Sequence, residues 1–163
     1  MLKKIKIENY TFYILSIILF LGFLTRSYFW FYGYGQGSNG LFIHGDGYYD
    51  ISKNLINNYE IFKNHWRSIT HIIYPLYLTP IFIFDLNPSI YIFFLHHLFV
   101  SLTLICIYFI GKFLGGIVVG LLASLIYCSN LFIAYWFNFT LADTAIHFHL
   151  SIFFLYFIYF IKY

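Results

Sequence analysis

Four long apolar runs set the pattern of this sequence, and polar or glycine-containing stretches separate them. The runs begin near residues 11, 88, 117 and 144. A helix rises about 1.5 Å per residue, so roughly 20 residues cross the ~30 Å hydrocarbon core of a bilayer. We therefore predict an all-α integral membrane protein with about four transmembrane helices. The predicted spans cover about residues 10–30, 88–112, 116–137 and 143–162.

The segment between the first two spans, residues 31–87, is predicted to be a long outer loop that carries short helices. Apolar side chains at positions 48, 51, 55 and, loosely, 59 have the spacing of one helix face lying at a membrane surface. Residues 69–84 are also apolar, but this stretch is too short for a full span and contains Pro75 and Pro80. Because proline disrupts helical hydrogen bonding, we expect a short helix or a re-entrant element there.

The first apolar run is predicted to be an uncleaved membrane anchor. A basic start followed by an apolar core resembles a signal peptide, but no small-residue cleavage pattern follows it. Arg26 comes near the end of the run instead, and its long side chain can reach the membrane surface. The aromatic residues after it, at 28–34, suit the headgroup layer.

Basic residues give the expected orientation. Lys3, Lys4 and Lys6 precede the first span, and cytoplasmic segments of membrane proteins are enriched in Lys and Arg. With four spans, Lys112 and Lys162 are cytoplasmic too. The loops at 31–87 and 138–143 then share the outer side, so the sequence predicts a multi-pass protein of the cell membrane with a cytoplasmic N-terminus.

Composition supports the membrane assignment and excludes several classes of protein. The chain is 61% hydrophobic and only 9% charged, whereas a soluble domain carries about 25% charged residues. A net charge of +3 from nine Lys and Arg is too sparse for a nucleic-acid surface. No P-loop, GxSxG, HExxH or Rossmann fingerprint is present. Cys106 and Cys128 lie in apolar runs and are expected to be small buried hydrophobic residues.

Two membrane-proximal aspartates are the candidates for chemistry. Asp46 lies between glycines just before the predicted amphipathic helix, and Asp143 opens the last span. Either carboxylate can act simply as a helix cap. However, His147 lies four residues after Asp143 on the same helix face, and together they could bind a divalent metal ion or a polar ligand.

The other histidines in the predicted spans are less informative. His149 points away from the face of Asp143, and the adjacent His96 and His97 cannot both face one site. A lone histidine in a span is more often a partner in a hydrogen bond between helices than a ligand.

The order of these parts resembles the N-terminal part of GT-C-fold membrane glycosyltransferases, in particular the group similar to protein O-mannosyltransferases and aminoarabinose transferases. The segments that carry the likeness are GDGYYDISKNLINNYEIF, YPLYLTPIFIF and LAD at 141–143. Nearly the whole chain is covered, but the motifs are short. Gly47 stands where many members have Glu, and the family's double proline is reduced to Tyr74-Pro75. Members usually run to several hundred residues, so we expect residues 1–163 to be one membrane domain that is incomplete at its C-terminus.

This resemblance implies transfer of a sugar from a polyprenyl-phosphate donor to a lipid, glycan or protein acceptor on the non-cytoplasmic face. It implies that Asp46 is the general base, which removes the proton from the attacking hydroxyl. Tyr49, Arg67, His71 and Asp143 are the candidate substrate-binding residues, and Arg67 and His71 would stabilise the leaving phosphate. Asp143 and His147 are the candidate metal ligands.

Two other functions stay open at this point. The chain could be a non-catalytic four-span partner or truncated remnant that packs against a further membrane subunit through Gly111, Gly115, Gly116 and Gly120. It could also be a transporter of a metal or small solute that uses Asp46, Asp143 and His147. Internal repeats and paired broken helices are typical of transporters, and the sequence contains neither.

Overall fold

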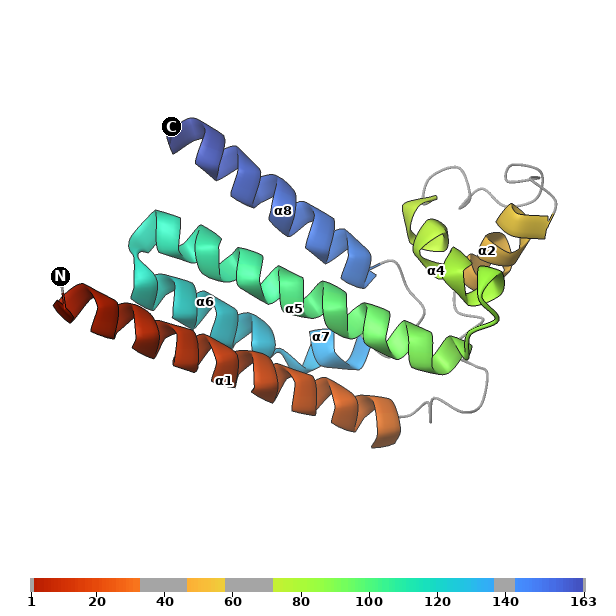
Figure 1. Ribbon diagram of the computed structural model, residues 1–163, viewed down its shortest axis with the longest axis horizontal. Helices are drawn as coiled ribbons and strands as arrows, with labels where there is room; N and C mark the ends of the chain where they lie inside the picture. The colour runs from red at the N-terminus through yellow and green to blue at the C-terminus, as the bar shows by residue number, and fades with distance from the viewer. Residues whose placement is uncertain (1, 33–46, 58–71, 137–142, 163) are drawn as a thin grey trace.

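The computed structural model describes residues 2–32, 47–57, 72–136 and 143–162, and all regular structure in these residues is helical. Figure 1 shows the elongated arrangement of the helices, with the short helices α2 and α4 at one end. The helices are α1 (Leu2–Tyr32), α2 (Tyr48–Asn57), α4 (Ile73–Ile83), α5 (Pro88–Gly115), α6 (Ile117–Cys128), α7 (Leu131–Trp136) and α8 (Asp143–Lys162).

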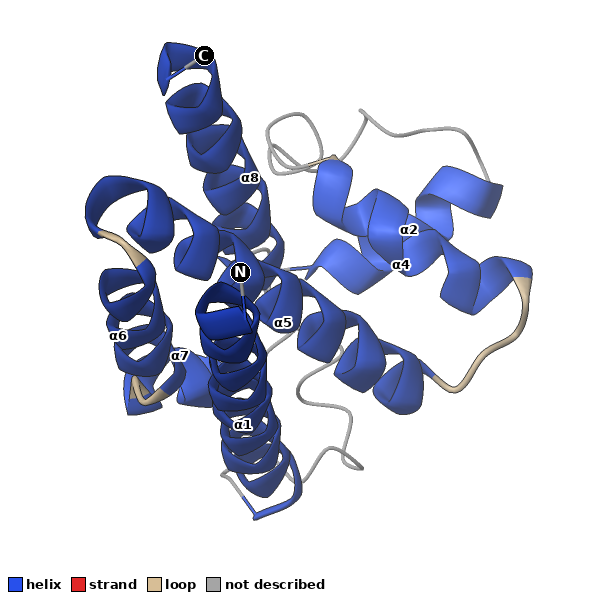
Figure 2. Ribbon diagram, turned by 60° about the vertical axis from the view of Figure 1, so that its left-hand side comes forward, coloured by secondary structure: helices blue, strands red, loops and turns tan. Residues whose placement is uncertain are grey.

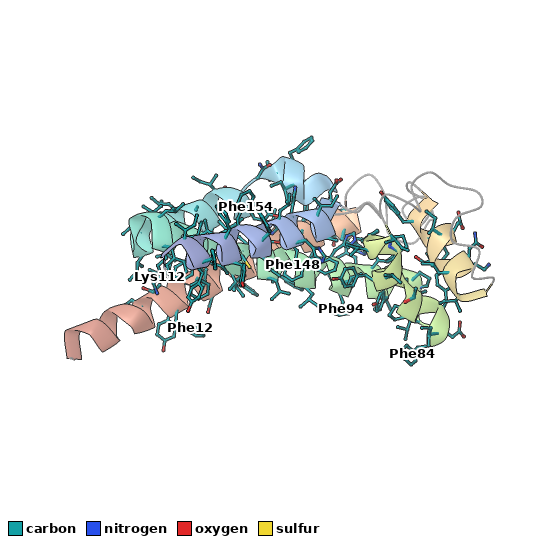
Figure 3. The ribbon with its side chains drawn as sticks, turned by 90° about the horizontal axis from the view of Figure 1, so that it is seen from above. Phe12, Phe84, Phe94, Lys112, Phe148 and Phe154 are labelled. Atoms are coloured by element: carbon teal, nitrogen blue, oxygen red, sulfur yellow. The ribbon has the colours of Figure 1, made fainter. Side chains whose placement is uncertain are left out.

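Three of the described helices are long and apolar enough to cross a membrane. They are Tyr10–Tyr32 within α1, Pro88–Gly115, which is α5, and Asp143–Ile161 within α8. These segments correspond to the first, second and fourth predicted spans. Large apolar side chains cover their outer surfaces, as Figure 3 shows for Phe12, Phe94 and Phe154, which are 68%, 62% and 51% exposed. Such a surface is suited to lipid, and the three helices suggest a membrane-embedded protein.

The third predicted span is not one continuous helix. Its apolar run forms α6 and α7, which are separated at Ser129 and Asn130. The side-chain oxygen of Asn130 accepts hydrogen bonds from the backbone N–H groups of Phe132 and Ile133 at 3.0 and 3.2 Å. Asparagine is a preferred residue at the start of a helix because its side chain satisfies these otherwise unpaired donors. Asn130 therefore caps the start of α7 and interrupts the helix that the apolar run was predicted to form.

α5 and α6 form a close helical hairpin (Figure 2). Gly116, with φ of 89°, makes the turn in a conformation that favours glycine. A Cβ added to Gly111 would lie 2.7 Å from Gly120 Cα, and one added to Gly120 would lie 2.5 Å from the Tyr108 carbonyl oxygen. Gly111 and Gly120 thus allow contact within this chain, and they are not free to pack against a separate subunit.

α2 packs against α4, and the predicted face of the amphipathic helix is the face that is buried. Tyr48, Ile51 and Leu55 are 4%, 6% and 9% exposed. Between them, the Ser52 hydroxyl lies 2.7 Å from the Tyr48 carbonyl oxygen and 2.8 Å from that of Pro75 in α4. The spacing therefore identified the helix and its apolar face correctly, but protein covers this face where a membrane surface was expected.

α4 is a short helix, as its prolines predicted. Pro75 lies in the first turn, where a backbone N–H has no helical partner in any case. Pro80 lies inside the helix and cannot donate to the Leu76 carbonyl. The Thr79 hydroxyl donates to that carbonyl instead, at 2.8 Å. Asn87 then caps α5 by accepting from the Ile90 N–H, and Pro88 occupies the first turn.

The topology brings separate parts of the sequence to one end of the bundle. α5 and α8 both begin at the end where α2 and α4 lie, and the N- and C-termini lie toward the opposite end (Figure 1). A hydrogen bond of 3.1 Å between the Tyr77 hydroxyl and His149 Nε2 ties α4 to α8. The chain between α5 and α8 must therefore return along the length of the bundle.

Candidate functional site

Polar side chains of the long helices gather toward the end of the bundle that carries α2 and α4. We call this set the polar layer, and it connects α1, α4, α5, α6 and α8 through hydrogen bonds between side chains. Its members on the long helices and α6 are Arg26, Ser27, His96, His97, Tyr127, His147 and His149. Charged or ionisable groups within membrane helices are costly, so such a set marks a candidate site.

The predicted site residues fall into two groups. Asp46, Arg67 and His71 lie outside the described residues, so their predicted roles stay predictions. Tyr49, Asp143 and His147 are described. Gly47, which directly follows Asp46, has φ of 76° and leads into α2. An L side chain rarely adopts this backbone conformation, which accounts for a glycine where the resembled family often has glutamate.

Tyr49 lies on the side of α2 next to its buried face. Its ring packs against Phe82 of α4, with 4.8 Å between the ring centroids. Burial raises the pKa of the Tyr49 phenol, and the neighbouring Asp50 carboxylate raises it further. The phenol is therefore neutral near pH 7, where it can donate a hydrogen bond to a ligand.

Tyr74 forms the centre of the contact between α2, α4 and α5. Its hydroxyl lies 2.7 Å from His96 Nε2, and its ring meets the ring of Tyr48 edge-on at 5.4 Å. Burial raises the pKa of Tyr74 well above its usual value, and the neighbouring Tyr48 and then Asp143 add to the effect.

Asp143 is the first residue of α8 and is exposed. A carboxylate here is stabilised by the positive end of the helix dipole, so the capping role that the sequence allowed is compatible with the structure. Next to it, Thr144 is 5% exposed, and its hydroxyl has no hydrogen-bond partner among the described residues. The start of α8 thus presents an accessible carboxylate beside a buried, unpaired hydroxyl.

His147 and His149 contact different helices. His147 Nδ1 lies 3.4 Å from the Tyr127 hydroxyl of α6, whereas His149 contacts Tyr77 of α4 and lies 2.6 Å from the Ala145 carbonyl oxygen. Within the described part of the chain, no group of three His, Cys, Asp or Glu side chains is placed to hold a metal ion. Asp143 and His147 therefore have no third ligand there, and the metal site stays a prediction.

His96 and His97 point to different sides of α5, because successive residues of a helix are about 100° apart. His96 meets Tyr74, while His97 Nε2 lies 3.4 Å from the Ser27 hydroxyl of α1. The His97 ring also packs between Phe23 and Phe93, at centroid distances of 4.4 and 4.3 Å. One turn of α5 thus joins the α2–α4 end to the inner face of α1.

Arg26 is the residue whose position the sequence predicted wrongly. Its side chain does not extend outward from the protein, because it is 1% exposed and its Nη1 donates to the Gly22 carbonyl at 2.9 Å. A Cβ on Gly22 would lie 2.7 Å from that nitrogen, so the glycine makes room for the guanidinium. The signal that could have found this position is the spacing of Gly22 and Arg26, which places both on one face of α1.

The predictions for the two cysteines are confirmed. Cys106 and Cys128 are free and buried, and the Cys128 thiol donates to the Ile18 carbonyl of α1 at 3.3 Å. Comparison with known proteins adds no further assignment: no protein-family model, curated protein or solved structure matches this chain. A function must therefore be argued from the residues and their arrangement.

Proposed function

We propose that this chain forms the membrane domain of a glycosyltransferase that moves a sugar from a polyprenyl-phosphate donor to an acceptor on the non-cytoplasmic face. One observation carries the proposal. α2, which begins two residues after Asp46, and the start of α8 at Asp143 lie at the same end of the bundle, and the Tyr74 ring of α4 lies 5.4 Å from the Tyr48 ring of α2. This arrangement supports a shared region for Asp143 and the helix that follows Asp46 in the sequence.

The proposal requires that the chain cross the membrane four times, with α6 and α7 making the third crossing together. α6 has 12 residues and α7 has 6. At about 1.5 Å per residue these helices rise roughly 27 Å, close to the ~30 Å of the hydrocarbon core. The pair also links the end of α5 at one end of the bundle to the start of α8 at the other. A break in a membrane helix is tolerated where the freed backbone groups find hydrogen-bond partners. Asn130 supplies such a partner here by accepting from the Phe132 N–H.

The proposed reaction uses residues of the loop between the first two spans, together with Asp143 at the start of α8. Asp46 takes the proton of the acceptor hydroxyl as its oxygen attacks the anomeric carbon. The bond between that carbon and the phosphate oxygen breaks, and its electron pair leaves with the polyprenyl phosphate. Arg67 and His71 are proposed to stabilise the charge on the leaving phosphate. Tyr49 and Asp143 are proposed to bind the sugar or the acceptor through hydrogen bonds.

Three substitutions test the proposal in membranes that contain the full chain. Release of polyprenyl phosphate from a panel of polyprenyl-phosphate sugars measures turnover. Loss of a general base typically costs about 10²–10⁴-fold, so we expect at least a 100-fold loss for Asp46→Asn. For Asp143→Asn we expect a loss of roughly 10-fold, as for one hydrogen bond to a charged group. Asp85→Asn is the matched control, because Asp85 is exposed and its φ of 49° suits asparagine equally well.

The outcomes separate the parts of the proposal. Undiminished turnover by Asp46→Asn would remove Asp46 as the base, and full activity of Asp143→Asn would reduce Asp143 to a helix cap. If wild-type membranes release no polyprenyl phosphate from any donor of the panel, the proposed function itself fails.

A further inference from the structure

Arg26 is a buried charge in the membrane-embedded part of the molecule. It lies in the candidate span Tyr10–Tyr32, six residues before the end of α1, and only 1% of its surface is exposed. Six residues correspond to roughly 9 Å along a helix, which places Arg26 less than two turns from the outer end. Burying a guanidinium without an anionic partner is strongly unfavourable, so the charge needs an explanation.

The hydrogen bonds of Arg26 leave one buried edge of the guanidinium without a partner among the described residues. Nη1 donates to the Gly22 carbonyl within α1. Nε and Nη2 are buried and have no hydrogen-bond partner among the described residues. These two nitrogens lie on the same edge of the planar group, and their N–H bonds point in parallel. This is the fork that binds two oxygens of a carboxylate or a phosphate at once.

The surroundings of Arg26 supply no carboxylate within the described part of the chain. The described neighbours that act on it are Tyr127 and Cys128 of α6, Cys128 also through a side-chain hydrogen bond, and His97 of α5. Asp50, Asp85 and Asp143, the aspartates that the structure describes, are all exposed. No described carboxylate therefore offsets the charge of Arg26, and an oxyanion from outside the described part of the chain would supply the missing partner.

We propose that the Nε–Nη2 edge of Arg26 binds the phosphate group of a membrane lipid, with His97 next to it. Near the end of a transmembrane helix, lipid phosphates are the abundant oxyanions, since the headgroup layer begins at the edge of the hydrocarbon core. The identity of the lipid rests on the proposed function: the donor and product of that reaction both carry a polyprenyl phosphate. In that reaction Arg26 holds the phosphate while Asp46 acts on the acceptor.

A binding experiment tests the site without requiring turnover. The full chain is purified in a phosphate-free maltoside detergent, and its affinity is measured for polyprenyl phosphate, polyprenol, phosphatidylglycerol and inorganic phosphate. We expect Arg26→Gln to weaken polyprenyl phosphate binding at least 10-fold without affecting polyprenol. Arg26→Lys keeps the charge but loses the fork, so we expect an intermediate loss. Lys112→Gln, which removes an exposed charge from the opposite end of α5, should change nothing.

The other two phosphate probes identify the source of the phosphate. Polyprenyl phosphate bound at least 10-fold more tightly than phosphatidylglycerol supports the donor as the ligand. Equal affinities for the two lipids, both lost in Arg26→Gln, would support a headgroup site and overturn the assignment to the donor. Binding of inorganic phosphate with equal affinity would overturn the lipid assignment altogether. Equal binding of all probes by wild type and Arg26→Gln overturns the site.

Thermal unfolding keeps the test decisive if Arg26→Gln does not fold. A ligand that binds the native state raises its unfolding temperature, so polyprenyl phosphate should stabilise the wild-type chain and polyprenol should not. The absence of any shift at saturating polyprenyl phosphate overturns the proposal. Phosphate binding without sugar transfer would leave this site standing and reject the proposed function. Sugar transfer that is unaffected in a folded Arg26→Gln chain would support the proposed function and reject the phosphate site at Arg26.

Discussion

Tyr74 is the single residue on which the contact between α2, α4 and α5 most depends. It is 2% exposed, and its hydroxyl bonds to His96 at 2.7 Å. Tyr74→Phe keeps the ring that packs on Tyr48 but removes the hydroxyl, which leaves His96 Nε2 without this buried partner. Such a loss costs about 1–3 kcal/mol, so we expect the free energy of unfolding in detergent to fall by that amount. Tyr32→Phe, at a position that is 78% exposed, should leave it unchanged.

The same tyrosine gives a pH dependence with a definite sign. Burial raises the pKa of Tyr74 in the folded chain above its unfolded value near 10. Above pH 10 the unfolded chain therefore binds fewer protons than the folded chain, and stability falls as the pH rises. Below pH 10 Tyr74 is protonated in both states and contributes no slope. We expect Tyr74→Phe to lose stability less steeply than wild type between about pH 10 and 11, and parallel curves would contradict a buried phenol.

At the scale of single residues, the sequence correctly predicted which face of α2 is buried, but it did not predict the burial of Arg26. Positions 48, 51 and 55 repeat with a helical period, so their common burial could be predicted from their spacing. Arg26 stands in a helix that is apolar on all sides, so the hydrophobic pattern does not indicate which side faces the protein, and only the spacing of Gly22 and Arg26 hints at it. Long side chains can reach the membrane surface, so the physical rule favoured exposure. Only the packing of α1 on α6, together with the space at Gly22, decides the direction.

Among the elements, the α5–α6 hairpin depends most on the absence of a side chain. In Gly120→Ala the new Cβ would lie 2.5 Å from the Tyr108 carbonyl oxygen, and a backbone atom cannot rotate away. The two helices must therefore separate. Overpacking of this kind costs about 1–3 kcal/mol, and we expect a corresponding loss of stability in thermal or denaturant unfolding.

Val118→Ala is the control for this prediction. Val118 lies in the first turn of the same helix, and its side chain is 68% exposed, so its truncation should change stability by about 0.5 kcal/mol or less. If Gly120→Ala is as stable as Val118→Ala, the close approach of α5 and α6 is wrong.

The elements also show where sequence patterns lose their information. The ends of α5 were predictable because Pro88 and Gly115–Gly116 punctuate the chain. The break between α6 and α7 was not, because apolar residues continue on both sides of it. Its only sequence signal is the short polar pair Ser129-Asn130, and a membrane helix tolerates such a pair in many contexts. The capping bonds of Asn130 show that here it ends one helix and starts another.

For the whole molecule, the decisive question is the number of membrane crossings. α5 and α8 run in the same direction, from the α2–α4 end toward the end that holds both termini (Figure 1). If α6 and α7 cross the membrane together, Lys112 and the end of α8 share the cytoplasmic side. If they do not cross, α8 would have to span in the direction opposite to α5, which would place its end outside and contradict their parallel arrangement.

Single cysteines report this difference directly. Lys53, Asp85, Lys112 and Ile161 are exposed and are replaced one at a time by cysteine. We expect a membrane-impermeant maleimide to label the cysteines at 53 and 85 in intact cells, and those at 112 and 161 only after permeabilisation. The wild-type chain gives the background, since Cys106 and Cys128 are 8% and 4% exposed. Labelling of 161 but not 112 in intact cells would reduce the crossings to three. Labelling of 112 and 161 but not 53 in intact cells would show the opposite orientation. Asp143 and the α2–α4 pair would then lie on the cytoplasmic side, where a transferase of the proposed kind cannot act.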